Sequence, residues 1–245
     1  MASFDVLTLH PDMLRATLLT SVIGRGVGQG HLHIGVHDIR EFGHGKHRSV
    51  DDSPYGGGAG MVMKVDVVAA ALDSVRRPDS HVILTSPAGR TFTQADAVRL
   101  AGLPHVVILC GHYEGVDARV EGLVDELLSI GDFVLTGGEI AAAAMIDAAA
   151  RLVPGVLGND ASSGDETFHD DLVEYPQYTR PREWNGESVP DVLLSGNHAR
   201  VDVWRKAVAR RRTAAMRPDL WVKHCERHGM SPDVSVAIDD PEQDG

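Results

Sequence analysis

Three segments of the chain share one layout, and this layout constrains the fold more than any other feature of the sequence. Each begins with a continuous apolar run and ends in a turn rich in glycine or proline: HVILTSPAGR (81–90), HVVILCGHYEG (105–115) and LLSIGDFVLTGGE (127–139). A continuous apolar run is typical of a strand that is covered on both faces. We therefore predict three neighbouring strands of a parallel sheet.

Helical patterns fill the gaps between these segments, and the N-terminal part repeats the alternation. Helices are predicted from Pro11 to about Ser21, from about Asp66 to Val75, and over 93–102, 117–128 and 139–153. Further strands are predicted over 3–9 and 31–39, with the turn-rich connector GRGVGQG (24–30) between them. Strands that alternate with helices indicate an α/β fold with a mostly parallel sheet flanked by helices.

The glycine-bearing turns predict where a ligand binds. In parallel α/β sheets ligands lie beyond the carboxyl ends of the strands, so three such turns indicate one site built mainly from backbone atoms. The loop PYGGGAGM (54–61) has four glycines within five positions and would let backbone N–H groups approach an anion such as phosphate. It lacks the spacing and the Ser/Thr of a Walker motif, and a structural loop is equally consistent with it.

Cysteine, apolar runs and histidine narrow the class of protein. The two cysteines, Cys110 and Cys225, imply no disulfide framework and favour a reducing cytoplasm. The longest apolar segment, 140–153, is interrupted by charged residues and too short to span a bilayer. Thirteen histidines include clusters at His31/His33, His44/His47 and His224-Cys225 with His228, but none matches a four-ligand zinc site, so no metal site is assigned.

Charge is distributed unevenly along the chain. The net charge of −12 argues against indiscriminate nucleic-acid binding, but the last fifteen residues hold five acids and no Lys or Arg. Between His198 and Pro218 there are seven cations against one acid, and apolar residues recur there at helical spacing. This pattern predicts an amphipathic helix with a basic outer face. A solvated surface helix and a phosphate-binding helix both fit it.

The composition changes after PGVLG (154–158). The next thirteen residues, 159–171, are polar, acidic and almost free of aliphatic side chains, which is typical of a flexible linker or of a loop ordered by substrate. We therefore predict a main domain over 1–158, a linker over 159–171, a small helical domain over 172–230 and an acidic, disordered tail over 231–245.

Seven motifs occur in an order that is specific to one family. They are VDDSPYGGGAGMVMK, SPAGR, CGHYEGVDARV, SIGDFVLTGGE, RLVPGVLGN, EYPQYTRP and VPDVLLSGNHARVDVWR. Together they resemble the bacterial tRNA (guanine-N1)-methyltransferases, which methylate the guanine just 3′ of the anticodon, and the similarity covers about residues 3–220. The resemblance implies a SPOUT methyltransferase: an α/β domain with a C-terminal trefoil knot, a helical tRNA-binding domain over 172–230, and a cytoplasmic homodimer with shared active sites.

The resemblance also implies the methyl donor, S-adenosyl-L-methionine, and the residues that hold it. These match Thr85, Ser86, Pro87, Gly111, Tyr113, Glu114, Ile130, Gly131, Asp132, Phe133, Val134, Leu135, Gly137 and Gly138. Glycine is expected at such positions because an adenosine packed among loops leaves no room for a Cβ. No role is assigned to His112, where relatives also carry Arg. The family is reported to need magnesium as well, but no ligands for it are assigned.

Catalytic and substrate-binding residues follow from the same resemblance. Guanine N1 carries a proton, so a general base is required, and the matching linker acid is Glu166, with the adjacent Asp165 as an alternative. Arg151 matches an arginine proposed to steady the guanine O6. The residues expected to contact tRNA, including its anticodon stem-loop, are Glu174, Tyr178, Arg180, His198, Arg205, Arg210 and Arg211.

Three other functions are compatible with parts of this pattern. A SPOUT methyltransferase that acts on another RNA would keep most motifs, although EYPQYTRP favours the anticodon-loop enzyme. A non-catalytic nucleotide- or RNA-binding protein could use the same glycine loops, but it would leave the acid and arginine set unexplained. A phosphoryl-transfer enzyme built on PYGGGAGM would need a Lys-Ser/Thr pair that this loop lacks.

Overall fold

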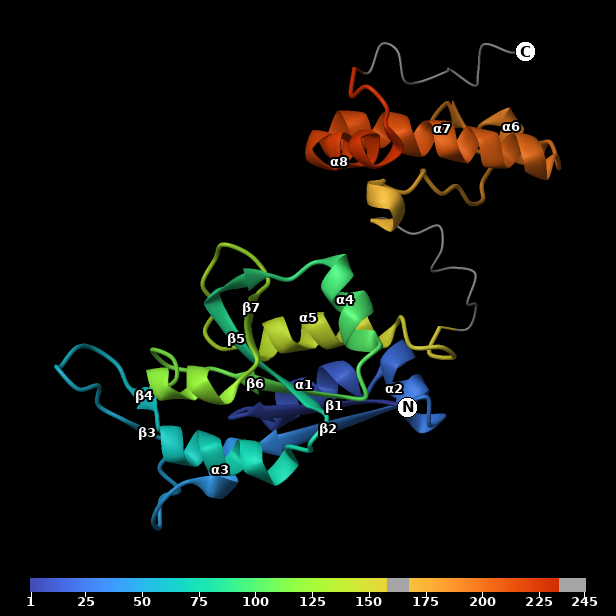
Figure 1. The fold of residues 1–245 in the computed structure, drawn as a ribbon. Helices are drawn as coiled ribbons and strands as arrows, with labels where there is room; N and C mark the ends of the chain where they lie inside the picture. The colour runs from blue at the N-terminus through green and yellow to red at the C-terminus, as the bar shows by residue number, and fades with distance from the viewer. Residues whose placement is uncertain (158–167, 234–245) are drawn as a thin grey trace. The chain divides into compact units, whose positions relative to one another are not determined.

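A computed structural model describes residues 1–157 and 168–233 of the chain (Figure 1). The chain divides into two compact units, Met1–Asp160 and Ala161–Gly245, and each is described by itself. The predicted linker and tail fall largely outside the described residues, as do Asp165 and Glu166.

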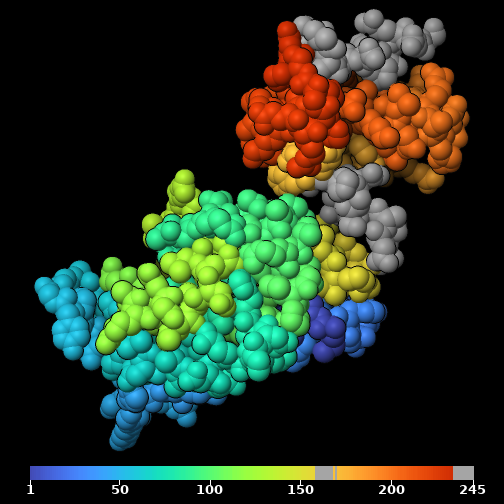
Figure 2. All heavy atoms as spheres, viewed as in Figure 1, coloured from blue at the N-terminus to red at the C-terminus, as the bar shows by residue number. Residues whose placement is uncertain are grey.

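Unit 1 is built on a five-stranded sheet in the order β2-β1-β6-β5-β7, and all of its neighbouring strands are parallel. The strands are β1 (Ala2–Thr8), β2 (Leu32–Asp38), β5 (Ser80–Thr91), β6 (His105–Cys110) and β7 (Glu126–Ser129). Two short strands, β3 (Asp51–Asp52) and β4 (Val62–Met63), pair antiparallel at the base of the 54–61 loop. That loop projects from the body of unit 1, as Figure 1 and Figure 2 show. The predicted mostly parallel α/β sheet is therefore confirmed.

Helices cover both faces of this sheet. One face carries α1 (Pro11–Leu18), α2 (Ser21–Gly28), α4 (Gln94–Ala101) and α5 (Glu139–Ala150). The other face carries α3 (Val65–Val75) and two 3-10 helices, η1 (Ile39–Phe42) and η2 (Ala118–Leu123). Figure 1 shows α5 and α3 on opposite sides of the strands.

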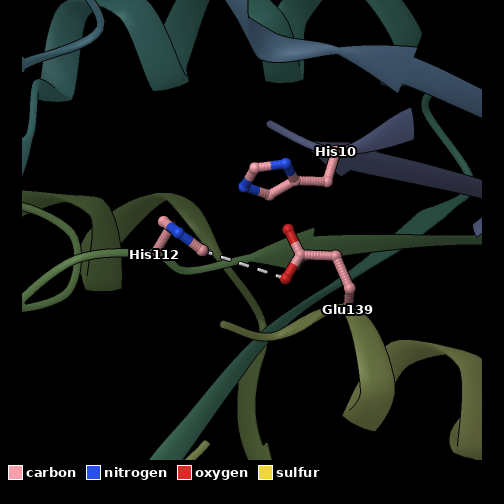
Figure 3. Close-up of side chains that lie close together, drawn as sticks. All are labelled: His10, His112 and Glu139. Carbon is pink, nitrogen blue, oxygen red and sulfur yellow. Dashed lines mark ion pairs between the residues drawn. The ribbon is translucent and has the colours of Figure 1, made fainter. Parts of the chain in front are cut away.

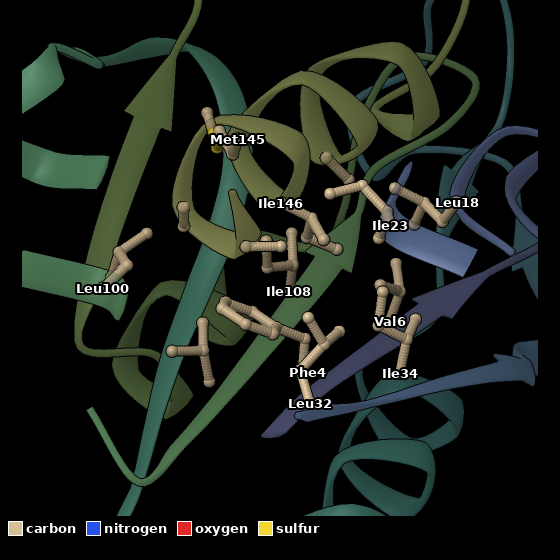
Figure 4. Close-up of a cluster of buried hydrophobic side chains, with 14 of the residues drawn as sticks. Phe4, Val6, Leu18, Ile23, Leu32, Ile34, Leu100, Ile108, Met145 and Ile146 are labelled. Atoms are coloured by element: carbon tan, nitrogen blue, oxygen red, sulfur yellow. The ribbon is translucent and has the colours of Figure 1, made fainter. Parts of the chain in front are cut away.

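The two apolar cores follow from the alternation of side chains along the strands. On β6, Ile108 packs with Phe4, Met145 and Ile146 under α5, as Figure 4 shows, whereas its neighbour Leu109 packs on the α3 side. Because every residue of β6 is buried, the sequence of this strand is a continuous apolar run and does not alternate between apolar and polar residues.

Several predicted elements are wrong in detail. The connector predicted over 24–30 is mostly helix α2, in which Gly26 lies against Val156 and Leu32 and so allows close packing. The helix predicted over 117–128 is replaced by η2 and β7. The amide of Asp125 donates to the carbonyl of Val82 and its carboxylate accepts from the amide of Val82, which joins the segment to β5. In the segment 127–139, predicted as a strand followed by a glycine-rich turn, the strand ends at Ser129 and the apolar residues that follow form a loop.

Unit 2 contains mostly helices in its described part. They are the 3-10 helix η4 (His169–Asp171), α6 (Asp191–Leu194), α7 (His198–Met216) and α8 (Pro218–His228). A short hairpin joins β8 (Glu183–Trp184) to β9 (Glu187–Ser188). On α7, Trp204, Val208, Ala209 and Thr213 are buried, which confirms the predicted helix and a packed side on it, but not a wholly basic outer face. Arg205, Arg210 and Arg212 are half-buried, so its cations are not all on the outer face.

Within 1–157 and 168–233, no helix is both long and apolar enough to cross a membrane.

Candidate functional site

A cavity in unit 1 lies at the carboxyl ends of β5, β6 and β7. Its volume is ≈ 320 Å³, which falls within the range typical of small-molecule sites. Its walls come from three turns, 84–87, 111–116 and 128–138, together with Ala141 of α5. We call it the carboxyl-edge cavity. It is the site that the three glycine-bearing turns predicted.

Hydrogen bonds hold the 111–116 and 128–138 turns against each other and tie Thr85 to β6. The amide of Gly138 donates to the carbonyl of Gly111 at 2.8 Å, and His112 pairs with Gly137 in an isolated antiparallel bridge. Thr85 donates its hydroxyl to the carbonyl of Leu109 at 3.2 Å. The cavity wall is therefore continuous with the ladder of the sheet.

Two glycines permit this close approach. A Cβ on Gly138 would overlap the Thr85 hydroxyl and would lie 2.9 Å from Cα of Cys110 and 3.1 Å from the amide of Gly111. Gly131 has φ +151°, a conformation that L side chains rarely adopt, and a Cβ there would meet the ring of Phe133. These positions keep main-chain atoms, rather than side chains, at the cavity surface.

The loop 54–61 is fastened to the cavity rim. The amide of Glu114 donates to the carbonyl of Met61 at 3.1 Å, and the amide of Met63 donates to the carbonyl of Gly115 at 3.0 Å. A Cβ on Gly60 would overlap the side chain of Glu114. The loop therefore supports the 111–116 turn through its base, whereas Tyr55 near its tip is fully exposed.

Thirteen of the fourteen residues predicted to bind the methyl donor line this cavity, and Asp132, which is exposed, does not. Sequence reasoning missed eight lining residues: Leu84, His112, Gly115, Val116, Leu128, Ser129, Thr136 and Ala141. Most of these residues are next to a predicted residue in the sequence, and this adjacency could have identified them. Phe133 and Val134, predicted as buried strand residues, are exposed on the loop.

Arg151 does not lie at this cavity. It follows the last residue of α5, whereas Glu139 at the start of α5 lies beside the cavity. Twelve helical residues span about 18 Å, so the two ends of α5 are well separated. Asp165 and Glu166 lie outside the described residues.

A second cavity, of ≈ 270 Å³, lies within unit 2. It is lined by Tyr175, Pro176, Gln177, Tyr178, Leu193, Gly196, His198, Val201 and Arg205. The guanidinium carbon of Arg205 lies 4.7 Å from the centre of the Tyr175 ring, a cation–π distance. Three of the residues predicted to contact tRNA, namely Tyr178, His198 and Arg205, are thus brought together.

The other predicted tRNA contacts do not line this second cavity. Glu174 accepts a hydrogen bond from the side-chain amide of Gln177 at 2.6 Å. Arg180 is exposed and precedes the cis proline Pro181. Arg210 and Arg211 lie further along α7, the first half-buried and the second exposed.

The fold and the carboxyl-edge cavity define the class of protein: an α/β protein with a ligand cavity built from strand-end turns of a parallel sheet. Comparison with known proteins identifies the family. The family model described as tRNA (Guanine-1)-methyltransferase TrmD matches residues 2–223, so the chain belongs to this family.

Curated relatives are similar over most of their length. A tRNA (guanine-N(1)-)-methyltransferase of Citrifermentans bemidjiense is 54% identical over 89% of this chain and 88% of the relative. The corresponding protein of Thermus thermophilus is 52% identical over 89% of this chain and 90% of the relative. The corresponding protein of Deinococcus radiodurans is 50% identical over 97% of this chain and 85% of the relative.

Proposed function

We propose that this chain transfers the methyl group of S-adenosyl-L-methionine to N1 of the guanine immediately 3′ of the anticodon in tRNA. The observation that carries the proposal is the carboxyl-edge cavity, whose three turns coincide with the family's motifs in a chain that belongs to that family. Both cysteines are buried and free, which is consistent with a cytoplasmic protein.

The cavity fits an adenosyl group. Five of its lining residues are glycines, so amides and carbonyls are available to bind the edge of a base. Apolar side chains such as Leu84, Ile130 and Leu135 offer contacts for its faces. The donor supplies an electrophilic methyl group. The protein's own contribution is to hold that group in line with N1, and such positioning supplies much of the rate acceleration.

Methylation at N1 also requires that the N1 proton leaves. We assign this step to the carboxylate of Glu166, with Asp165 as the alternative, and general-base catalysis of this kind contributes about 10²–10⁴-fold. Arg151 would stabilise the negative charge that develops on O6 as the proton departs. Both roles are carried over from the family's motifs.

The position of Arg151 supports a shared active site. It lies about 18 Å along α5 from the end that adjoins the cavity, so it is poorly placed to reach a guanine there. A homodimer in which each cavity receives Arg151 and unit 2 of the partner subunit removes this difficulty. We propose this arrangement, together with the trefoil knot, for the chain.

The second unit offers a surface for RNA. The cavity at Tyr178, His198 and Arg205 joins aromatic side chains to a cation, a combination suited to nucleotides. Further along α7, the exposed cations would track phosphates of the anticodon stem. We place tRNA on this unit.

Magnesium, which the family resemblance implies, has one candidate group at the cavity. Glu114 is the single carboxylate among the described lining residues. Mg²⁺ prefers oxygen ligands, keeps several waters and often takes only one or two carboxylates, so Glu114 fits a hydrated ion. Its carboxylate would hold such an ion near the donor or the incoming phosphate.

The decisive experiment is single-turnover methylation of unmodified tRNA transcripts with labelled S-adenosyl-L-methionine, followed by mapping of the methyl group. We expect label at N1 of the guanine 3′ of the anticodon. Glu166→Gln should lower the rate by about 10²–10⁴-fold, whereas Asp165→Asn should have a small effect. Binding of donor and tRNA without transfer would instead identify a non-catalytic RNA-binding protein, and label at another site would identify a different substrate.

Mixing two inactive variants tests the shared site. Gly138→Val damages one subunit's cavity, and Arg180→Ala damages the other subunit's unit 2. If cavities and second units pair across the dimer, the mixed dimer contains one intact site and regains activity. If each subunit works alone, the mixture stays inactive.

A further inference from the structure

We infer that His10, His112 and Glu139 form a binding site for a divalent transition-metal ion of the zinc class. One potential ligand atom from each residue lies within 4.8 Å of the other two. Figure 3 shows the three side chains directed toward a common space. This inference does not depend on methyl transfer, and it departs from the sequence prediction, which assigned no metal site.

The sheet brings these three residues together from distant parts of the sequence. His10 lies between β1 and α1, and His112 follows β6. Leu7 on β1 pairs with Leu109 on β6, so the parallel strands end at the same edge. Glu139 is the first residue of α5 and is fixed there by the bond between Gly138 and Gly111. The backbone of three rigid elements therefore positions the ligands.

Glu139 is oriented as metal-binding carboxylates usually are. Its side chain is 3% exposed, and its Oε1 accepts a hydrogen bond from the buried hydroxyl of Thr8 at 2.8 Å. Partners of this kind fix the ligand and strengthen metal binding. The other oxygen, Oε2, faces His112 and lies 4.0 Å from its Nδ1. That distance is too long for a hydrogen bond.

His112 presents an unsatisfied nitrogen to the same space. Its Nδ1 is buried and has no hydrogen-bond partner within the described part of the chain. A buried polar atom without a partner is costly, so this nitrogen needs a group that it can bind. The ring of His10 lies with its centre 4.8 Å from the His112 ring and is tilted by 59°. A cation among the three would satisfy His112 and Glu139 together.

Gly137 allows this arrangement. A Cβ at this position would overlap both Oε2 of Glu139 and Nδ1 of His112. Any other residue would therefore displace two of the three ligands. Because Gly137 also lines the carboxyl-edge cavity, a bound ion would tie the 111–116 turn and the start of α5 together beside that cavity.

The donor set selects the kind of ion. Two imidazoles and one carboxylate form a zinc site with an open fourth position, whereas magnesium and calcium prefer oxygen ligands. Zinc bonds of about 2.0–2.2 Å place tetrahedral ligands about 3.4 Å apart. The side chains must therefore move inward by about an ångström, and His10, which is exposed, can do so by rotating its ring. Its exposure also leaves a path for the ion to enter.

Zinc titration of chelator-treated protein tests the inference, with calorimetry for affinity and Co²⁺ absorption for coordination geometry. We expect one equivalent at this site with a tetrahedral Co²⁺ spectrum. His10→Ala and His112→Asn should each weaken binding by at least about 100-fold, and Thr8→Val by about 10–100-fold, as loss of an outer partner does. Zinc should raise the Tm of the wild-type protein but not that of His10→Ala.

A second cluster in unit 2 provides the matched control. Asp170, His224 and His228 also lie within 4.8 Å of one another, and His228 is half-exposed, so His228→Ala removes a ligand there without opening the core. Zinc binding at the first site should be unchanged in this variant. The inference is wrong if the wild-type protein binds no zinc, if His10→Ala binds zinc as the wild type does, or if only His228→Ala loses it.

Discussion

Nε2 of His105, which is fully buried, lies 2.8 Å from Oδ2 of Asp5 across the β1–β6 pair. His37 on β2 reaches the other oxygen of Asp5 at 2.6 Å, and Ser80 at the start of β5 lies 2.6 Å from Nδ1 of His105. This polar chain crosses four adjacent strands, from the first residues of β5 and β6 through the middle of β1 to the last part of β2. It therefore fixes the alignment of the strands whose far ends form the site.

Asp5→Asn should destabilise the protein by about 2–3 kcal/mol, because the amide cannot accept hydrogen bonds from both imidazoles as the buried carboxylate does. The matched control is Asp12→Asn, since Asp12 is almost fully exposed and pairs with Arg15 on the surface of α1. Its cost should stay below about 0.5 kcal/mol. Urea unfolding at neutral pH measures both values, and equal effects would contradict the structural role of Asp5.

The same carboxylate predicts a dependence of stability on pH. Burial by itself would raise the pKa of Asp5, but hydrogen bonds and charge from His37 and His105 outweigh it and lower the pKa to about 2. Since the folded pKa is depressed, this contribution is present above about pH 3.8 and is lost as the pH falls towards 2. Wild-type protein should therefore lose stability over that interval more steeply than Asp5→Asn does.

Asp96→Ala should cost about 2–4 kcal/mol of stability. This buried carboxylate accepts two bonds from Arg90 at 2.8 and 2.7 Å and caps α4 through the amide and hydroxyl of Thr93. A lost cap costs about 1 kcal/mol, and the rest comes from Arg90 left without this partner. Asp73→Ala, on the exposed surface of α3, should change the midpoint of denaturation very little.

Gly138→Ala should weaken binding of S-adenosyl-L-methionine by at least tenfold. The new methyl group would press on Cα of Cys110 and on the amide of Gly111, neither of which can move without shifting β6. Gly122→Ala is the control because a Cβ there meets nothing within 4 Å. Calorimetric titration of the donor into each variant, with a Tm for each, separates binding from folding.

Thr213→Val tests the packing of unit 2. The hydroxyl of Thr213 is buried, accepts a bond from the amide of Val173 at 2.8 Å and donates to the carbonyl of Ala209 at 2.7 Å. Valine keeps the shape but leaves the Val173 amide unsatisfied, which costs about 1–3 kcal/mol. Thr17→Val on the exposed side of α1 should be nearly neutral. Hydrogen exchange in α7 and α8 would report the difference directly.

Salt dependence tests the role proposed for α7. Replacing the exposed cations Arg200, Lys206 and Arg211 by alanine should reduce the log–log slope of tRNA affinity against salt by about 0.7–0.9 for each phosphate that is no longer neutralised. Lys46→Ala in unit 1, also exposed, should leave the slope unchanged. An unaltered slope in the triple variant would make α7 a solvated helix that does not touch tRNA.

Local pattern predicted the sheet better than it predicted the segments between strands. The continuous apolar run of β6 identified a strand covered on both faces, and the structure confirms it. The run after Ser129 also contains several apolar residues, but Gly131 adopts a positive φ, and the hydroxyl of Ser129 donates to the carbonyl of Gly131, so the chain turns there instead. The glycines of α2 favoured a turn in the sequence-based prediction. The segment is helical because tertiary packing at Gly26 outweighs the low helix propensity of glycine.

The candidate site was predictable where it is made of consecutive residues. Turns that follow three parallel strands must meet at one edge, and this topology places residues 111–116 beside 130–138. The cluster of His10, His112 and Glu139 is not made of consecutive residues, so no signal for it appears in the sequence. Glu139, for example, lies 131 positions after Thr8, its hydrogen-bond partner. The register of β1 against β6, together with the bond between Gly138 and Gly111, brings those side chains together.

The glycine-rich wall of the carboxyl-edge cavity has a consequence for inhibition. Every residue has a backbone carbonyl and every residue except proline has a backbone N–H, so few point substitutions in the wall can remove the groups that a main-chain-directed inhibitor would use. Substitutions at Gly137 or Gly138 would block the inhibitor only by deforming the end of the sheet. A substitution in these turns that excludes such a compound would therefore also disturb the binding of the protein's own ligand.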